Sequence, residues 1–245
     1  MFSKCENLIS ISLPKSAKEI QNCLLSGCIN LKDVELPEVP ELGFGTFEHC
    51  LSLEKIDLPQ SITKVGILTF GSLYNLKEVN MPSVVEIGDS TFVYCNNLEK
   101  VSMGAIQEIG SEAFFGISTI KSIYLPANLK SINKKAFALC FNLGKIYSMS
   151  QTAPNADETS FNDISEDCTV YVPQGCAVSY KAAPGWNKLN IVETDMTGIV
   201  ENVIGKEVKA IACYDLQGRK MTKVARGVNI IKMSNGTIRK VWKKK

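Results

Sequence analysis

The sequence predicts a mainly β protein, a right-handed solenoid of short coils followed by a small antiparallel β domain. An apolar pattern returns every 22 or 23 residues, as in the stretch CLSLEKIDLPQSITKVGILTF at 50–70. Self-similarity at a fixed period of this length is the signature of a solenoid. The pattern stops near residue 193, and apolar and polar residues then alternate at period two, as strands require. We therefore divide the chain into repeats at 1–150, an irregular capping repeat at 151–193 and a small basic β domain at 194–245.

Each repeat contains one predicted strand, with the motif L-x-x-I-x-L-P. The first apolar residue of this motif occurs at Leu8, Leu31, Leu53, Leu76, Leu98, Ile120 and Leu143. The I-x-L segment is typical of a short strand, and the proline ends it because proline has no N–H for the sheet ladder. Consecutive copies about 4.8 Å apart form a parallel sheet, which we place on the concave face of a leucine-rich solenoid.

The return segment of each repeat has an aromatic residue four positions after a glycine or an asparagine. The aromatic residues are Phe47, Phe70, Phe92, Phe114 and Phe137, and the residues four positions earlier are Gly43, Gly66, Gly88, Gly110 and Asn133. Asparagine is the residue other than glycine that most readily adopts positive φ. The exchange of glycine for asparagine therefore predicts a left-handed backbone turn at this position.

One repeat position is usually cysteine. It is occupied by Cys5, Cys28, Cys50, Cys95 and Cys140, with Leu73 and Ile117 in two other copies. Interchange with leucine and isoleucine predicts a buried packing site, where a free thiol behaves as a small hydrophobe. A metal or disulfide ladder is the alternative, but the total of nine cysteines is odd and no C-x-x-C pair with a partner histidine exists. We expect no metal and no cofactor.

The repeated pattern C-x-x-L-x-x-I-x-L-P followed by I-G-x-x-x-F resembles the BspA-like leucine-rich repeat family. The resemblance covers about residues 2–193, with departures at Gln21, in place of the turn glycine, and at Met103-Gly104. Proteins of this family occur mainly among the secreted and surface proteins of anaerobic bacteria and also in some protozoa. The resemblance therefore implies an exported recognition protein.

The two ends of the repeat array differ. Phe2 and Cys5 stand in the same relation as Phe47 and Cys50, so the chain opens at the end of a repeat without a cap. We expect the natural protein to continue upstream and to carry its export signal there. No stretch resembles a secretory signal or is apolar over the length that a membrane span needs.

At the other end, TVYVP at 169–173 predicts the strand of a shortened final coil, and residues 176–186 predict a brief helix that ends near a proline. The sequence V-P-x-G followed by Y-K-x-A-x-G-W resembles a frequent closing unit of the same family. We expect Trp186 to plug the exposed core of the last coil.

The C-terminal segment differs in charge from the repeats. Residues 195–245 contain 12 basic and 4 acidic residues, which leaves 15 basic and 21 acidic residues before them. Asn235-Gly236 between alternating runs is the strongest short hairpin signal, so we predict a unit of three or four antiparallel strands. Its terminal lysines are typical of a protected sheet edge. A nucleic-acid interface would need interleaved aromatics, and Trp242 is the one aromatic residue in the lysine-rich end.

The stretch YDLQGRKM, then Gly227, a strand, Asn-Gly and a lysine-rich end resemble the C-terminal sorting domain of type IX secretion. The sequence departs from that pattern at Val228-Asn229, where Ile-Tyr is usual. The resemblance implies that residues 194–245 contact secretion machinery.

Catalytic motifs are missing from the sequence. There is one histidine, His49, on the return side of a coil, and no P-loop, G-x-G-x-x-G or H-E-x-x-H. We therefore predict that the protein is not an enzyme and that its function lies in its surface. The side chains that flank the central strand residue form the candidate ligand-binding surface: Asp33, Glu35, Lys55, Asp57, Glu78, Asn80, Lys100, Ser102, Ser122, Tyr124, Lys145 and Tyr147.

This mixed charged surface becomes basic and tyrosine-bearing toward the C-terminal repeats. Tyrosine is favoured at contact surfaces because it offers a large area at a low entropy cost. Our first hypothesis is an exported or cell-surface protein with an adhesion-type role that binds a protein of a host or neighbouring cell. The alternative is a carbohydrate-binding accessory module, for which Tyr124 and Tyr147 are the candidate platforms.

Overall fold

The computed structural model describes residues 2–196, 210–214, 219–221, 227–233 and 238–243. The chain forms two compact units, Met1–Met196 and Thr197–Lys245. The predicted fold class is confirmed: the first unit is a solenoid of parallel strands, and the second contains a small antiparallel sheet.

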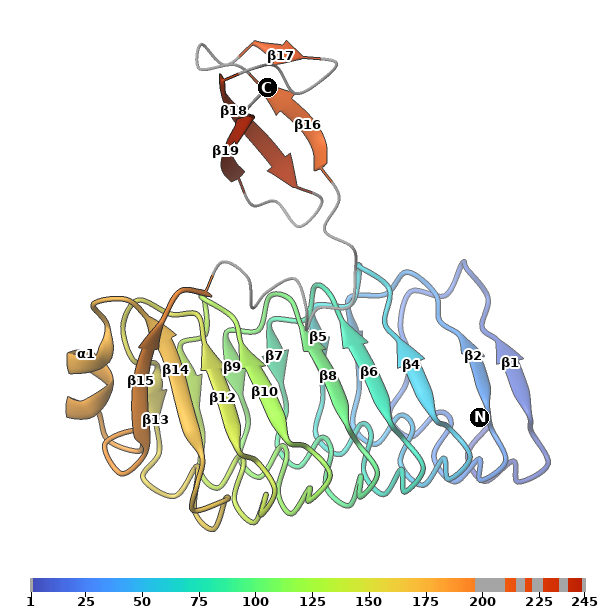
Figure 1. Ribbon diagram of the computed structural model, residues 1–245. Coiled ribbons are helices and arrows are strands. Elements are labelled where there is room, and N and C mark those ends of the chain that lie inside the picture. Colours follow the sequence, from blue (N-terminus) through green and yellow to red (C-terminus); the bar gives the residue numbers. More distant parts are fainter. Residues whose placement is uncertain (1, 197–209, 215–218, 222–226, 234–237, 244–245) are drawn as a thin grey trace. The chain divides into compact units, whose positions relative to one another are not determined.

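One parallel strand from each coil lies on the same side of the first unit (Figure 1). These strands are β1 (Ser10–Ser12), β2 (Asp33–Glu35), β4 (Lys55–Asp57), β6 (Glu78–Met81), β8 (Lys100–Met103), β10 (Ser122–Leu125), β12 (Lys145–Ser148), β14 (Thr169–Pro173) and β15 (Asn190–Thr194). We call their outward side the strand face. They pair in three groups, β1-β2, β4-β6-β8 and β10-β12-β14-β15.

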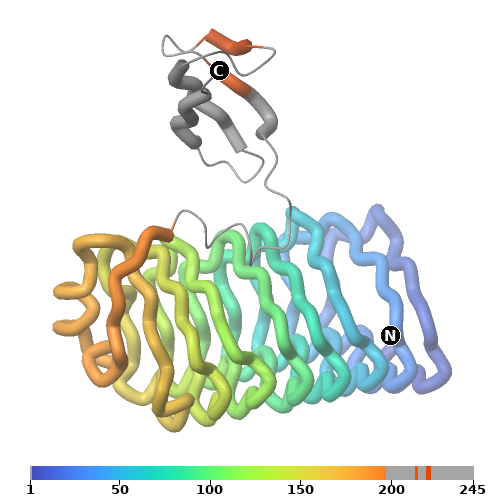
Figure 2. The backbone as a smooth tube through the Cα atoms, in the orientation of Figure 1, coloured from blue at the N-terminus to red at the C-terminus, as the bar shows by residue number. Residues whose placement is uncertain are grey.

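A second parallel sheet, which the sequence did not predict, runs along the return side of the coils. It consists of β3 (Glu41–Leu42), β5 (Lys64–Val65), β7 (Glu86–Ile87), β9 (Glu108–Ile109), β11 (Ser131–Ile132) and β13 (Asn155–Ala156). These strands form one uninterrupted six-stranded sheet. The backbone trace in Figure 2 shows the coils of the first unit stacked side by side.

The core consists of rows of identical positions from successive coils. Leu31, Leu53 and Leu76 are completely buried. The phenylalanines of the return segment stack ring on ring, from Phe47 through Phe137, with centroids 5.0–5.8 Å apart. Each coil thus covers the apolar side of its neighbour, which is the main source of stability in such a fold.

The prediction of a left-handed turn at the repeat glycines is wrong. Positive φ lies two residues later in each coil, at Gly45, Leu68, Ser90, Glu112 and Lys135. The glycines are required for a different reason, because the backbones of adjacent coils approach closely at this position. A Cβ atom on Gly88 would lie 2.7 Å from the carbonyl carbon of Gly66, and one on Gly110 would lie 2.6 Å from the nitrogen of Asp89.

The cysteine row is buried from Cys28 to Cys140, as predicted, whereas Cys5 is partly buried, and the four buried thiols also make hydrogen bonds. The Cys95 thiol donates to the carbonyl of Phe70 at 3.0 Å, and the Cys140 thiol to that of Phe114 at 3.1 Å. Burial raises the pKa of both thiols to about 12, so they remain protonated donors. All nine cysteines are free, and the described part of the chain contains no cluster of three His, Cys, Asp or Glu that could hold a metal.

The C-terminal end of the array is closed by α1 (Ala177–Ala182) and Trp186. The Trp186 ring lies 4.8 Å from the ring of Phe161, so it continues the aromatic row, and it contacts Tyr180 edge-on at 5.2 Å. Its Nε1 donates to the carbonyl of Pro154 at 2.8 Å. The predicted role of Trp186 as a plug is confirmed, because this side chain is completely buried.

The second unit contains β16 (Ala210–Tyr214), β17 (Lys220–Met221), β18 (Gly227–Met233) and β19 (Ile238–Lys243). They form an antiparallel sheet in the order β17-β16-β18-β19, as the alternating pattern predicted. The predicted Asn235-Gly236 turn lies outside the described residues. Among the residues that are described, no helix is long and apolar enough to cross a membrane.

Candidate recognition surface

The alternation of each strand points one set of side chains into the core and the other set outward. Ile56, Val79 and Ile123 are buried, whereas the residues on either side of them lie on the strand face. Parallel pairing brings equivalent outward residues into register. Lys55, Glu78 and Lys100 form one row across β4, β6 and β8, and Asp57, Asn80 and Ser102 form the next.

The outward residues of β4, β6 and β8 neutralise one another. The Nζ atom of Lys100 lies 3.2 Å from Glu78 Oε1, and Lys55 Nζ lies 3.9 Å from the same oxygen and 3.4 Å from Asp57 Oδ2. Exposed pairs of this kind contribute about 0–1 kcal/mol each. We call these four residues, Lys55, Glu78, Lys100 and Asp57, the paired charges.

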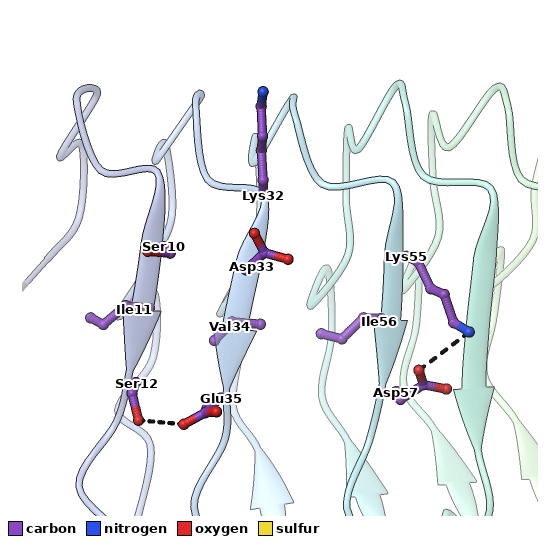
Figure 3. A pocket seen from close by; sticks show the side chains of 10 residues that line it. All are labelled: Ser10, Ile11, Ser12, Lys32, Asp33, Val34, Glu35, Lys55, Ile56 and Asp57. Carbon is purple, nitrogen blue, oxygen red and sulfur yellow. Dashed lines mark hydrogen bonds and ion pairs between the residues drawn. The ribbon is translucent and has the colours of Figure 1, made fainter.

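A shallow groove of about 650 Å³ lies at the N-terminal end of the strand face, where β2 and β4 do not pair (Figure 3). Strands β1, β2 and β4 line it, and they include the predicted residues Asp33 and Glu35. Ser12 donates a hydrogen bond of 2.7 Å to Glu35, and Lys55 extends toward Asp57 (Figure 3). Ser12 and Glu35 thus bond to one another, as do Lys55 and Asp57, whereas the exposed Asp33 has no ion pair among the described residues.

The outward residues of β10, β12 and β14 form a row of tyrosines. The ring centroids of Tyr124 and Tyr147 are 4.8 Å apart, and those of Tyr147 and Tyr171 are 4.9 Å apart, with interplanar angles of 28° and 17°. We call these three residues the tyrosine row. Val192 follows Tyr171 in register on β15 and is 38% exposed.

Tyr124 is the most enclosed member of the tyrosine row, with 9% of its surface exposed. Desolvation by burial, and then the neighbouring Tyr147, raise its pKa to about 12, so its hydroxyl stays protonated. Because the central ring of Tyr147 has a stacked neighbour on each side, its two faces are covered. Tyr147 therefore has only its ring edge and hydroxyl left for a partner.

Lys145 lies beside the tyrosine row, in register with Ser122 and Thr169. Its side chain is exposed and has no ion pair within the described part of the chain. The outward positions of β10, β12, β14 and β15 are Ser122, Tyr124, Lys145, Tyr147, Thr169, Tyr171, Pro173, Asn190, Val192 and Thr194. Lys145 is the one charged side chain among these ten positions of the described strands.

The family comparison agrees with this repeat geometry. The model of the BspA type leucine rich repeat region matches in six copies, over residues 1–105 and 85–192. The chain belongs to the BspA-type leucine-rich repeat family. No curated protein matches it at a significant level.

Solved structures of leucine-rich repeat proteins are similar to this chain. One from Bacteroides ovatus is 26% identical with a TM-score of 0.59, over 78% of this chain and 53% of that one. A leucine rich cell surface protein from Faecalibacterium prausnitzii is 19% identical with a TM-score of 0.45, over 84% and 65% of the two chains. One from T. pallidum is 22% identical with a TM-score of 0.41, over 84% and 74%. The present chain thus spans about half the length of the B. ovatus protein.

The BspA-type repeats place all the predicted surface residues on the strand face. Asp33 and Glu35 lie on β2 at the groove, and the others lie on two chemically different halves. Glu78 and Lys100 belong to the paired charges, whereas Lys145 and Tyr147 belong to the surface with the tyrosine row. Sequence reasoning missed Tyr171. Its signal was present in TVYVP, because Tyr171 occupies the strand position of Tyr147, one coil later.

His49 lies on a turn of the return segment at φ +60°, with 53% of its side chain exposed and Nδ1 3.8 Å from Glu48 Oε1. The carboxyl pKa values that shift are all lowered, for instance that of Glu54 by a hydrogen bond from Lys77 and that of Glu193 by the backbone N–H of Ala177. Lowered values favour the ordinary ionised form, whereas a general acid or base needs a pKa near the working pH.

Proposed function

We propose that the protein is a non-enzymatic recognition protein with an adhesion-type role, which binds a protein partner through its strand face. The observation that carries this proposal is the tyrosine row on the outward side of β10, β12 and β14. The solenoid core is complete without these rings, because Ile123, Ile146 and Val170 fill the inward positions of the same strands. Tyrosines of this kind are enriched in protein contact surfaces.

The stacking geometry favours a protein partner over a carbohydrate. A sugar packs flat against the free face of an aromatic ring, and both faces of Tyr147 are covered by neighbouring rings. The edges and hydroxyls that remain suit hydrogen bonds and side-chain packing with a polypeptide. The two aromatic residues named for a carbohydrate platform, Tyr124 and Tyr147, lie in this stack.

The twelve residues Asp33, Glu35, Lys55, Asp57, Glu78, Asn80, Lys100, Ser102, Ser122, Tyr124, Lys145 and Tyr147 form the proposed surface, now with Tyr171. The test uses fluorescently labelled full chain and intact cells, either epithelial cells or neighbouring bacteria. We expect binding that is lost after protease treatment of the cells and kept after glycosidase treatment.

A variant with Tyr147→Ala and Tyr171→Ala should bind less well. A matched control, Lys64→Ala, removes an exposed ion pair with Glu86 on the return side and should bind like the parent chain. Binding that glycosidase abolishes and protease leaves intact would support the carbohydrate alternative instead.

We propose further that the protein is exported or displayed at the cell surface and that residues 194–245 direct its secretion. The basic charge of this segment and its resemblance to type IX sorting domains support this proposal. The segment fused to a fluorescent protein should appear in the medium or at the surface of a bacterium that has this route. Retention of the fusion inside the cell would contradict the proposal.

A further inference from the structure

Beyond the N-terminal pair β1-β2, the strand face divides into β4-β6-β8 and β10-β12-β14-β15, and these two halves differ in how far their charged side chains are already paired. In β4, β6 and β8, Glu78 lies within ion-pair distance of both Lys55 and Lys100. A partner that binds there must compete with these internal pairs. In β10, β12, β14 and β15, Lys145 is charged and unpaired among the described residues, and it lies next to uncharged side chains.

From this difference we infer that the partner is recognised at the tyrosine row and Lys145, and that it is a protein segment with a carboxylate beside apolar or aromatic side chains. This inference rests on the proposed function and names the chemistry of the partner at the same surface. A partner carboxylate bonds to the Lys145 ammonium, and its apolar side chains pack on the tyrosine row and Val192.

The tyrosine row is suited to this role because it is rigid before binding. Each ring is carried by a strand whose neighbours are hydrogen-bonded in register, and each contacts the next ring at 4.8 or 4.9 Å. Side chains that are already ordered lose little entropy when a partner binds, so more of the contact energy appears as affinity. The paired charges stand on strands of the same kind but offer little apolar area.

The apolar part of the surface extends past the tyrosines. Val192 is 38% exposed on β15, and Pro173, two residues after Tyr171 in β14, is also partly exposed. Exposed apolar side chains grouped in this way mark interaction sites on soluble proteins. The nearby Ser122, Thr169 and Asn190 supply hydrogen-bonding groups at the rim, where Asn190 Nδ2 donates to Thr169 Oγ1 at 3.1 Å.

A carboxylate fits this surface better than a phosphate or sulfate group. Phosphopeptide-binding domains commonly use clusters of arginines, whose planar groups bind two oxygens at once. The described strands of this half offer one lysine and no arginine. A single ammonium group matches a single carboxylate in charge.

The experiment uses a phage-displayed library of random dodecapeptides, selected on the immobilised full chain. Peptide selection finds surfaces where a few side chains carry most of the binding energy. We expect enriched peptides to contain Asp or Glu within a few residues of Trp, Phe, Tyr or Leu. Enrichment of basic peptides, or of no peptides, would overturn the inference.

The enriched peptide, made synthetically, is then measured against purified variants. We expect Tyr147→Ala to weaken its binding about 30-fold and Lys145→Glu about 10-fold. A peptide with its acidic residue changed to lysine should recover most of its affinity for the Lys145→Glu chain. Tyr147→Phe keeps the stacked ring, so a small effect of that variant with a large effect of Tyr147→Ala assigns the binding to the ring.

The matched control is Lys64→Ala on the return side, which removes an exposed ion pair with Glu86 and should change the affinity less than twofold. The double variant Lys55→Ala and Lys100→Ala disrupts the paired charges and should weaken binding less than Tyr147→Ala does. If the double variant loses binding and Tyr147→Ala does not, the strand face still binds protein and the inference about its C-terminal half is wrong. If neither variant matters, the proposed function fails as well. Thermal melting of each variant separates loss of binding from loss of folding.

Two further measurements test other possible partners against the inferred acidic protein segment. Binding of heparin or of a phosphotyrosine peptide that is tighter than that of the acidic peptide would show that the anion is not a carboxylate. Sedimentation of the chain alone tests a second copy of the protein as the occupant, and a dimer lost on Tyr147→Ala would replace the inferred partner with self-association.

Discussion

The two halves of the strand face share one backbone geometry and carry different chemistry. In β4 and β6, the register places Lys55 opposite Glu78, whereas in β10 and β12 the same kind of register places Tyr124 opposite Tyr147. Both arrangements rest on inward apolar rows, with the buried Val79 behind one and the buried Ile146 behind the other. The stacking of coils therefore fixes where outward side chains lie, and it leaves their identity free for function.

The energies of the two surfaces support this separation. Exposed ion pairs contribute about 0–1 kcal/mol each, and an aromatic pair about 0.5–1.5 kcal/mol beyond its buried area. A single buried phenylalanine contributes more, because its removal costs about 3–5 kcal/mol. Folding thus depends on the core that both halves share, and the differences between the halves are available for binding.

The largest expected effect tests whether the core is common to both halves. Phe70→Ala, in the coil of β4, and Phe137→Ala, in the coil of β10, should each lower the free energy of unfolding by about 3–5 kcal/mol, because each ring is completely buried between two others. Urea denaturation measures both. Phe141→Ala, at a ring that is 58% exposed, is the control and should change little. A loss of stability in only one of the two variants would show that the two halves do not depend on the core in the same way.

A smaller effect is expected where adjacent coils approach each other. Gly88→Ala should destabilise the protein by about 1–3 kcal/mol, because its Cβ would lie 2.7 Å from backbone atoms of the preceding coil. Gly144→Ala is the matched control, since its nearest neighbours would be 4.0 Å away. Equal stability of the two variants in urea would show that the coils are not packed as closely as described.

The surfaces themselves should differ modestly in stability. Tyr147→Ala removes the ring that stacks on both Tyr124 and Tyr171, and it should lower the free energy of unfolding by about 1–2 kcal/mol. Lys55→Ala should cost at most about 0.5 kcal/mol, and 1 M salt should weaken even that effect because the pair is exposed. Comparing urea midpoints of the two variants at low and high salt checks both values. A larger cost for Lys55→Ala would mean that the paired charges hold the fold.

The smallest expected effect is a difference between the two halves in how stability depends on pH. The folded pKa of Tyr124 is raised to about 12, above its usual value near 10, so the stability that its burial gives is complete below pH 10 and is lost as the pH rises toward 12. Glu54, near the paired charges, has a pKa lowered by a hydrogen bond from Lys77. The stability that this bond contributes is therefore complete above the usual pKa of a glutamate and is lost as the pH falls through the lowered pKa.

Ultraviolet absorbance of tyrosinate tests the alkaline part of this difference. We expect a fraction of the tyrosines to ionise late in the folded protein, and Tyr124→Phe should remove part of that fraction. Tyr180, whose pKa is also raised to about 12 by burial, accounts for the rest and serves as the internal control. Ionisation of all tyrosines together near pH 10 would contradict the described burial of Tyr124.

Sequence reasoning predicted the parts of the fold that repeat. The buried rows, the cysteine position and the final aromatic plug follow from apolar residues at fixed spacing, as Leu53, Cys95 and Trp186 illustrate. The return strands were missed because two residues are too short to show a periodicity. The left-handed positions were assigned to the wrong residues, because the stacking of coils imposes positive φ on side chains as ordinary as Leu68 and Lys135.

The sequence could predict where the recognition surface lies, but not that it divides into a half with paired charges and a half with the tyrosine row. The strand motif placed Lys100 and Lys145 on one surface, but only the register shows that Lys100 lies 3.2 Å from Glu78. Tyr171 was not predicted as a surface residue because the spacing of the repeat changes after Tyr147. Strand β15 was not predicted because it lies beyond the last regular motif. Interactions between coils thus need the structure, even when the coils themselves can be predicted.

The most direct test of the account is hydroxyl-radical footprinting of the full chain with and without the selected acidic dodecapeptide. We predict that the peptide lowers oxidation of Tyr147 and Tyr171 and leaves Tyr74 and Tyr94 unchanged, since these two are exposed on the turns of the coils. Protection of Tyr74 or Tyr94 without protection of Tyr147 and Tyr171 would contradict the claim that the outward side of β10, β12 and β14 is the recognition surface.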